Sequence, residues 1–205
     1  MGRGESTVDT SSRAIIVLRD LFSPTAHKEI IDFVRDEAPT YPLHEDKELF
    51  NRRYYQNMDF FVHVHEQLTE LASECFGVAL KPSYSFLSMY EDKGKCPLHL
   101  DRPPCYRTID YLIDCESTDG WPINIAEPWS DEKVASFLGN KAVMDKQEKA
   151  QRIEMEKWES ININENDAVA YSGTNSWHYR PTLSKGKANL VFFHFVKEDY
   201  DGPLL

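Results

Sequence analysis

Basic residues are scarce in this sequence relative to acidic ones. Lysine and arginine together number 23, against 34 aspartate and glutamate residues, so the formal net charge is −11 at pH 7. Nucleic acids and anionic membrane surfaces attract proteins that carry a basic face. The charge balance therefore disfavours both kinds of partner and favours a protein whose acidic surplus keeps it soluble.

Cysteine and long apolar runs are also scarce. No two cysteines have C-x-x-C spacing, and a chain of 205 residues can bury a stable core without disulfides. We therefore expect reduced thiols in a cytoplasmic protein. No segment is long and apolar enough to span a bilayer, and residues 1–13 lack the apolar run of a secretory signal. We expect a flexible leader at 1–13 and a single domain over 14–205. The four cysteines are Cys75, Cys96, Cys105 and Cys115.

The rest of the chain moves between helix-like and strand-like patterns and has no internal repeat. Ser23 and Pro24 are typical of a helix start, and a second helical pattern falls within 60–76. The charged segment 130–159 predicts one or two inserted helices, and a solvated insertion is favoured over a lid. Helices followed by many strands indicate a mainly β sandwich or barrel with helical support. The predicted strands are 14–21, 83–90, 97–101, 108–113, 121–125, 160–163, 168–172, 178–180 and 189–196.

The most informative pattern is His99-x-Asp101, followed much later by His178. Residues i and i+2 of a strand point the same way, so His99 and Asp101 would face one ion while Leu100 faces away. Two imidazoles and one carboxylate cover one face of an octahedral metal and leave three positions open. That arrangement suits ferrous iron in oxygenases.

Short motifs of this kind also arise by chance. A chain of this composition is expected to contain about one histidine followed two positions later by an acidic residue. Two others are present, at His27 and His44. His27 falls within a helical pattern, and His44 follows Pro42 in a polar, loop-like stretch. Only the His99 pair lies between strand candidates and has a later histidine in a matching strand.

Five segments surround these residues in a recognisable order. They are IIVLRDLFSPTAHKEIIDFV, MYEDKGKCPLHLD, TIDYLID, NENDAVAYSGTNSWHYRP and GKANLVFFHFV. Together they resemble the Fe(II)/2-oxoglutarate-dependent oxygenases, in their prolyl-hydroxylase-like branch, from about residue 15 to residue 197. The resemblance implies a double-stranded β-helix, a jelly-roll or cupin-like core with N-terminal helices.

The same resemblance implies a set of site residues. His99, Asp101 and His178 would bind Fe(II), and 2-oxoglutarate and O2 would be the co-substrates. A cation would hold the distal carboxylate of 2-oxoglutarate, which arginine does through two parallel hydrogen bonds and lysine as a point charge. Lys187 lies near the family's place on the last strand, and Arg180 lies two residues after His178 on the same face. The choice between these two cations stays open.

Further positions have secondary roles by the same resemblance. Tyr90 precedes the iron motif, where the family often supplies a tyrosine to the co-substrate, and core packing explains it equally well. Asn189 shares the face of Lys187. Arg107 and Arg102 are candidate anchors for an anionic substrate. We expect Trp121 and Trp177 in the core and His194 as a buried histidine rather than a ligand.

Four functions remain in competition. The first is hydroxylation of an unactivated C–H bond in a small molecule, such as an amino acid or other metabolite, with succinate and CO2 as co-products. The compactness of the chain favours it. A peptidyl or protein hydroxylase is the alternative within the family. A cupin-like metal enzyme that does not use 2-oxoglutarate and a non-catalytic scaffold with a decayed site are the others.

Overall fold

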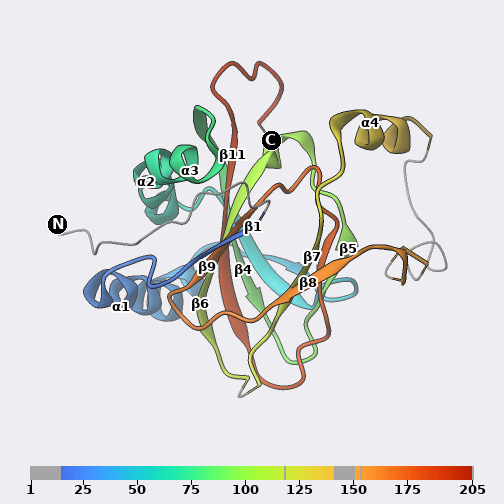
Figure 1. The fold of residues 1–205 in the computed structure, drawn as a ribbon. Coiled ribbons are helices and arrows are strands. Elements are labelled where there is room, and N and C mark those ends of the chain that lie inside the picture. The colour runs from blue at the N-terminus through green and yellow to red at the C-terminus, as the bar shows by residue number, and fades with distance from the viewer. Residues whose placement is uncertain (1–14, 118, 141–150, 153, 205) are drawn as a thin grey trace.

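The computed structural model describes residues 15–117, 119–140, 151–152 and 154–204, which form two antiparallel sheets that face each other (Figure 1). The larger sheet has seven strands in the order β1-β9-β6-β11-β4-β3-β2, and the smaller sheet has four in the order β5-β10-β7-β8. The larger sheet consists of β1 (Ile15–Leu18), β9 (Ala168–Tyr171), β6 (Arg107–Cys115), β11 (Ala188–Lys197), β4 (Leu80–Tyr90), β3 (Arg52–Gln56) and β2 (His44–Asp46). The smaller sheet consists of β5 (Cys96–His99), β10 (His178–Arg180), β7 (Ile123–Ala126) and β8 (Trp158–Ile161).

Helices cover the outer face of the larger sheet. Helix α1 (Pro24–Asp32) continues into a π-helical turn at Phe33–Glu37 and packs near β6, while α2 (Asp59–Gln67) and α3 (Thr69–Phe76) pack against β4 (Figure 1). Helix α4 (Asp131–Asn140) lies apart from these three, beside the smaller sheet. Within the described residues, no helix has the length and apolarity needed to cross a bilayer.

Local sequence explains where the first helices begin and end. The Ser23 Oγ accepts a hydrogen bond from the Ala26 N–H at 3.3 Å, and Pro24 occupies the first turn, as predicted. The single helix predicted within 60–76 is divided in two at Leu68, whose ψ is −7°. The Thr69 hydroxyl donates to the His65 carbonyl at 3.4 Å, a bond to the preceding turn that bends helices.

The central strands of the larger sheet are buried on both faces. Ile109 and Phe193 point outward into the core beneath the helices, and Leu112 and Leu190 point inward toward the smaller sheet. Because both faces are covered, β6 and β11 read as nearly continuous apolar runs. The inward residues pack on the smaller sheet mainly through Ile123, Ile125 and Ile161.

Most predicted elements are confirmed, and the differences lie at the sheet edge and around the motif. The prediction placed His44 in a loop, but it lies on the exposed edge strand β2, paired with Tyr54 of β3. Both strands of this hairpin were missed because neither shows apolar alternation. Strand β5 ends at His99, so Asp101 lies just beyond it. Residues 141–150 and 153 of the predicted insertion lie outside the described residues.

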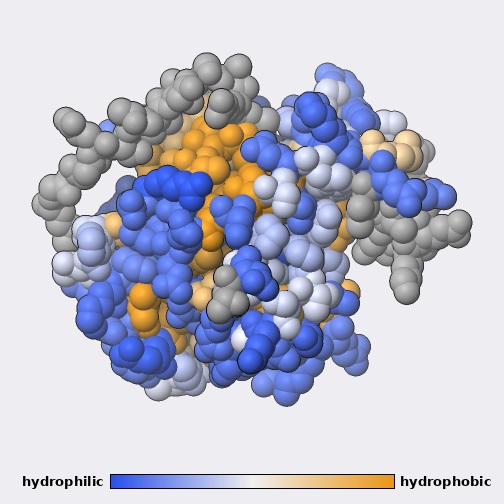
Figure 2. All heavy atoms as spheres, turned by 60° about the horizontal axis from the view of Figure 1, so that its bottom comes forward, coloured by the Kyte–Doolittle hydropathy of each residue, from blue (hydrophilic) through white to orange (hydrophobic). Residues whose placement is uncertain are grey.

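The surface agrees with the acidic composition. Figure 2 shows that the described residues on one face are mostly hydrophilic, with apolar residues gathered in one area toward its upper middle. Among the described residues, the large apolar side chains with high exposure are Leu49 at 51% and Met155 at 75%. Isolated exposed apolar residues of this kind are ordinary on protein surfaces.

His65 on α2 is a buried histidine in the outer core. Its ring lies against those of Phe193 and Phe195, with centroids 5.4 and 4.6 Å away, and its Nε2 has no hydrogen-bond partner among the residues that the structure describes. Burial, reinforced by His194, lowers the pKa of His65 to about 3. The folded state therefore favours the neutral ring, whose stabilising effect is present above the unfolded pKa of about 6.5 and is lost as the pH falls toward 3.

We expect replacement of His65 by phenylalanine to reduce the acid sensitivity of folding. From about pH 7.5 to about pH 5, His65 alone should lower the free energy of unfolding by about 2 kcal/mol, since each pH unit below the unfolded pKa of about 6.5 costs about 1.4 kcal/mol. Urea unfolding at both pH values measures the difference. His63→Phe, at an exposed position of the same helix, is the control. Equal pH dependence in the wild type and His65→Phe would contradict the assignment.

Candidate metal centre and its cavity

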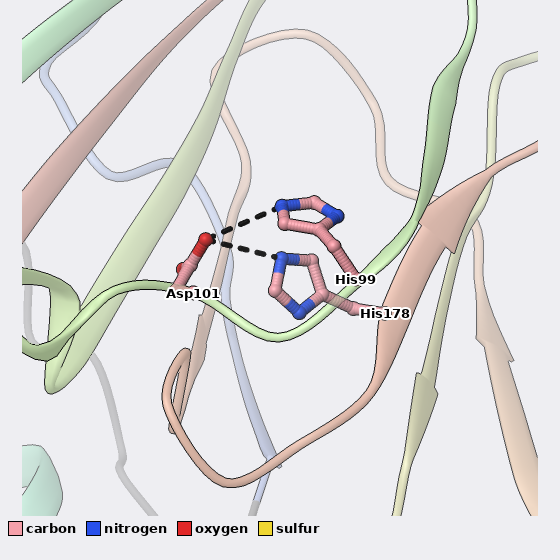
Figure 3. A group of neighbouring side chains, drawn as sticks. All are labelled: His99, Asp101 and His178. Atoms are coloured by element: carbon pink, nitrogen blue, oxygen red, sulfur yellow. Dashed lines mark ion pairs between the residues drawn. The ribbon is translucent and has the colours of Figure 1, made fainter. Parts of the chain in front are cut away.

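Two neighbouring strands and one loop bring the three predicted ligands together. His99 at the end of β5 pairs directly with His178 at the start of β10. Asp101 follows two residues after His99, and its backbone N–H donates to the Gly173 carbonyl at 2.9 Å. That bond ties the segment after β5 to the loop before β10. The three side chains therefore point toward one another (Figure 3).

The ligand atoms are close enough to share one ion. The Asp101 Oδ1 lies 3.3 Å from the His99 Nε2 and 3.7 Å from the His178 Nε2. One ligand atom from each residue lies within 4.8 Å of the others. His178 is buried, with 4% of its side chain exposed, whereas His99 is 36% exposed. The group therefore has one buried side and one side open to a cavity.

Backbone carbonyls orient both imidazoles. The His99 Nδ1 lies 2.7 Å from the Pro97 carbonyl oxygen, and the His178 Nδ1 lies 2.9 Å from that of Ser176. Since a carbonyl can only accept, each Nδ1 carries the proton and donates it. Each Nε2 is then the nitrogen left to bind a metal, which is the usual arrangement of metal-binding histidines.

Electrostatics favour the ligand forms of Asp101 and His178. Burial alone would raise the pKa of Asp101, but His178 and His99 outweigh it and hold that pKa well below its usual range. Burial, with a further contribution from His99, lowers the pKa of His178 to about 4. At neutral pH the carboxylate is therefore charged and the His178 ring is neutral, as metal binding requires. Burial alone would lower the pKa of His99, but Cys96 and Asp101 outweigh it and hold that pKa well above its usual value, so His99 releases a proton when it binds a metal.

The residues present fit a divalent iron ion. The Asp101 Oδ2 is buried and has no hydrogen-bond partner among the described residues, so one carboxylate oxygen is left unsatisfied. Two imidazoles and one carboxylate form the three-ligand set of non-heme ferrous sites, which keeps positions open for other molecules. Asp101, Cys105 and His194 form a second group with metal-ligand spacing. It fits less well, because burial raises the pKa of the Cys105 thiol and keeps it protonated.

Gly173 leaves the space that Asp101 occupies. A Cβ at this position would collide with the Asp101 carboxylate and would lie 2.6 Å from the Cys105 carbonyl oxygen. We expect Gly173→Ala to displace Asp101 and to weaken Fe(II) binding about 10–100-fold, the range seen when a ligand loses its support. Overpacking should also cost about 1–3 kcal/mol of stability. Anaerobic metal titration and urea unfolding measure the two effects.

Gly77→Ala is the control that separates the crowding of Asp101 from the general effect of replacing a glycine. Gly77 ends α3 with a φ of 62°, and a Cβ there would meet nothing within 4 Å. This variant should lose about 1 kcal/mol through backbone strain and keep its metal affinity. If Gly173→Ala bound Fe(II) as tightly as Gly77→Ala, the proposed packing of Asp101 would be wrong.

A cavity of about 230 Å³ adjoins the three ligands and runs between the two sheets. Its most buried cation is Arg180, which is 2% exposed. The Arg180 Nη2 donates to the Asp110 Oδ2 at 2.8 Å, and its Nη1 donates to the Trp121 carbonyl at 2.5 Å. The Arg180 Nε is buried and has no hydrogen-bond partner within the part of the chain that the structure describes. The guanidinium is therefore fixed in place and keeps one donor unused.

The rival cation, Lys187, lies outside the cavity. It precedes β11, its side chain is 56% exposed, and its Nζ lies 3.5 Å from the Glu91 carboxylate. Asn189 also points away from the cavity and donates to the Asp114 carboxylate at 2.8 Å. The geometry therefore brings Arg180, and not Lys187 or Asn189, to the cavity that the metal ligands share.

The other candidate residues divide between the cavity and the surrounding structure. Tyr90 lines the cavity and is 1% exposed. Arg102 lies at the cavity's edge, and its Nη2 donates to the Tyr84 hydroxyl at 3.2 Å. Arg107 does not line the cavity. Its guanidinium donates to the Ser172 hydroxyl at 2.7 Å and lies over the Tyr106 ring.

The residues expected in the core are buried. Trp121 packs against Tyr90, with ring centroids 4.7 Å apart, and donates from its Nε1 to the Pro181 carbonyl. Trp177 packs with Trp129 and Phe137 of the segment around α4. His194 is 6% exposed, and its Nδ1 lies 3.0 Å from the Thr108 hydroxyl. Burial lowers the pKa of His194 to about 4, so it is neutral beside the metal centre.

One arginine of the cavity was missed by sequence reasoning. Arg52 of β3 lines the cavity opposite the metal-bearing strands. The motif search gave no signal for it, because β3 itself was not predicted. Only the pairing of β3 with β4, which places Arg52 beside Tyr90, brings its side chain to this wall.

Comparison with known proteins identifies the fold. No protein-family model and no curated protein matches the sequence. The non-heme α-ketoglutarate-dependent carbocyclase SnoK of nogalamycin biosynthesis matches the structure with a TM-score of 0.73 at 9% identity, over 91% of this chain and 81% of that chain. A prolyl-4-hydroxylase from Pseudomonas putida matches with a TM-score of 0.66 at 8% identity, over 93% of this chain and 96% of that chain.

A third solved structure contains a metal and a co-substrate. HygX from Streptomyces hygroscopicus, with nickel and 2-oxoglutarate bound, matches with a TM-score of 0.65 at 10% identity, over 94% of this chain and 85% of that chain. These likenesses, together with the two facing sheets, define the fold as the double-stranded β-helix predicted from the sequence.

Proposed function

We propose that this protein is an Fe(II)- and 2-oxoglutarate-dependent oxygenase that hydroxylates an unactivated C–H bond of a small molecule, such as an amino acid or other metabolite. The observation that carries the proposal is the convergence of His99, Asp101 and His178 on a cavity that also contains the buried Arg180. Bound iron, 2-oxoglutarate and O2 would together supply the oxidant, with succinate and CO2 as co-products. HygX, solved with nickel and 2-oxoglutarate, supports the pairing of this fold with that co-substrate.

Each ligand has a defined role in the proposed reaction. His99 and His178 bind the metal through Nε2, since their Nδ1 atoms donate to backbone carbonyls. Asp101 binds through its carboxylate and supplies the one negative charge of the ligand set. The exposed side of His99 faces the cavity, so co-substrate and substrate reach the metal from there, while the buried side of His178 excludes water.

We assign the distal carboxylate of 2-oxoglutarate to Arg180, with Tyr90 as a neighbouring hydroxyl. Arg180 lines the cavity and keeps a buried, unused Nε donor, whereas Lys187 is exposed and paired with Glu91. Asp110 holds the guanidinium at the required angle and is a positioning residue. A charge-assisted hydrogen bond is stronger in such a dry site than in water.

Arg180→Gln is expected to weaken 2-oxoglutarate binding about 10–100-fold, the worth of one or two charge-assisted hydrogen bonds. Lys187→Gln should leave the affinity unchanged and is the matched control. Calorimetric titration of 2-oxoglutarate into the Mn(II)-loaded protein measures both, and circular dichroism confirms that the variants are folded. Loss of affinity in Lys187→Gln with wild-type affinity in Arg180→Gln would reverse the assignment.

The cavity favours a small molecule over a peptidyl substrate. It encloses about 230 Å³ between the sheets and is walled largely by aromatic side chains. The structural neighbours include both HygX, solved with hygromycin B, and a prolyl-4-hydroxylase, so the fold alone favours neither. Formation of succinate from 2-oxoglutarate in the presence of Fe(II) and O2 tests the reaction class. Metal-dependent turnover of a substrate without succinate would favour the cupin-like alternative instead.

A further inference from the structure

Arg52 is a cation in the cavity without a carboxylate partner among the described residues. Its Nη1 donates to two neutral groups, the Ser88 hydroxyl at 3.0 Å and the Tyr90 hydroxyl at 3.2 Å. Its Nε is buried, and none of the described residues offers it a hydrogen-bond acceptor. The adjacent Arg53, on the opposite face of β3, lies 3.6 Å from the Glu91 carboxylate. Arg53, which points outward, is therefore paired with a carboxylate, whereas Arg52, which points into the cavity, has no such partner among the described residues.

Aromatic rings surround the Arg52 guanidinium. Its Cζ lies 3.9 Å from the centroid of Phe50, 5.0 Å from that of Phe86 and 5.4 Å from that of Tyr54. Cation–π contacts hold the guanidinium in this position but do not neutralise its charge. Removing a charge from water without a counter-charge is costly, so the site favours an anionic ligand.

The charged side chains that line the cavity show which cation is left without a counter-charge. Three guanidinium groups and two carboxylates line it, which leaves one positive charge when the histidines are neutral. The charges of Fe(II) and of doubly ionised 2-oxoglutarate cancel each other. This count includes Arg102, which is exposed at the cavity's edge, so Arg52 is the guanidinium inside the cavity that has no carboxylate partner among the described residues. The lining groups are Arg52, Arg102, Arg180, Asp101 and Asp110.

Both carboxylates are already engaged. Asp101 belongs to the metal centre, and Asp110 accepts a hydrogen bond from Arg180. The described part of the cavity therefore offers no further carboxylate to a substrate ammonium group. This argues against a free amino acid, whose ammonium group would be left unpaired beside three arginines.

We propose that Arg52 binds the carboxylate of the substrate, and that the substrate is a monocarboxylic acid with an apolar body and no ammonium group. The body would lie against the aromatic wall that includes Phe50, Phe86 and Phe192. This inference rests on the proposed function for the reaction, but the anion site at Arg52 stands on its own contacts. It narrows the small-molecule class to acids and assigns a substrate-binding residue on β3.

Three probes of one shape test the inference: phenylacetate, the neutral phenylacetamide, and phenylglycine, which adds an ammonium group. Each is titrated calorimetrically into the Mn(II)- and 2-oxoglutarate-loaded protein and into the metal-free protein. Phenylacetate should bind about 10–100-fold more tightly than the other two, as a charge-assisted hydrogen bond predicts. Arg52→Gln should abolish that preference, Arg52→Lys should restore part of it, and Arg53→Gln should match the wild type. Arg53→Gln should not alter 2-oxoglutarate affinity, and Arg52→Gln, which also loses its hydrogen bond to the Tyr90 hydroxyl, should weaken it less than Arg180→Gln does.

The outcomes separate this inference from the proposed function. Equal binding of phenylacetate and phenylacetamide, or an unchanged preference in a folded Arg52→Gln protein, would overturn it. A loss of 2-oxoglutarate affinity in Arg52→Gln as large as that in Arg180→Gln would also overturn it, because Arg52 would then hold the co-substrate. If the wild type failed to bind 2-oxoglutarate but metal-free protein kept an Arg52-dependent preference for phenylacetate, the anion site would stand and the oxygenase assignment would fall.

Discussion

The Asp101→Ala protein is expected to bind Fe(II) far more weakly than the wild type. Loss of a residue that only supports a metal ligand weakens binding about 10–100-fold, and loss of the ligand itself should weaken it more. Asp101 is the one anionic member of the ligand set, and the two histidines bind a metal only as neutral imidazoles, through Nε2, because their Nδ1 atoms donate to carbonyls. Two neutral imidazoles alone do not offset the cost of removing water from a divalent ion. Anaerobic competition against a chromogenic chelator measures the affinity.

Asp114→Ala is the matched control for this result. Asp114 is a half-buried carboxylate that accepts a hydrogen bond from Asn189 and does not line the cavity. Its loss should leave Fe(II) affinity unchanged, so a general effect of removing a carboxylate can be recognised. If Asp101→Ala bound Fe(II) as tightly as the wild type, the assignment of Asp101 as a metal ligand would be wrong.

Asp110→Leu is expected to destabilise the protein by about 3–5 kcal/mol, because it leaves the Arg180 guanidinium buried without its counter-charge. The side chains of Arg180 and Asp110 are 1% and 0% exposed, and their nearest atoms lie 2.8 Å apart. Burial raises the pKa of Asp110, while Arg180 partly offsets that rise. Arg180→Met should be similarly costly, since the carboxylate is then left alone.

The double variant Asp110→Leu/Arg180→Met decides whether the two residues act as a pair. We expect it to recover most of the lost stability, because two apolar side chains of similar volume replace the buried ion pair. Urea unfolding of the four proteins gives the interaction energy from a double-mutant cycle. Additive losses would show that Asp110 and Arg180 contribute separately, and Asp110 would then not be the residue that positions the guanidinium.

The sequence pattern singled out the three residues that the structure brings together at the candidate metal centre, because the signal of the His99 pair is local. His99 and Asp101 lie two positions apart, and His178 lies in a strand-like segment of its own. The fold class followed from helices ahead of many strands together with the family-like segments. Strand β5 ends at His99, so Asp101 depends on a bond to Gly173 rather than on strand geometry, and the spacing alone could not show this.

The remaining site residues depend on contacts between distant segments. Arg180 and Lys187 are both cations shortly after His178, and the sequence left the choice open. The structure separates them because β10 carries Arg180 between the sheets, while Lys187 lies in the turn before β11. Arg52 reaches the cavity through the register of β3 against β4, which the charged and aromatic residues of that edge hairpin do not reveal.

The central claim is that His99, Asp101 and His178 form a working 2-oxoglutarate centre. Its most direct test is visible absorption during anaerobic addition of Fe(II) and then 2-oxoglutarate to the metal-free protein. We predict a weak charge-transfer band in the green region that requires both additions and is lost in His178→Ala. Iron binding without such a band, or a band that persists in His178→Ala, would contradict the account.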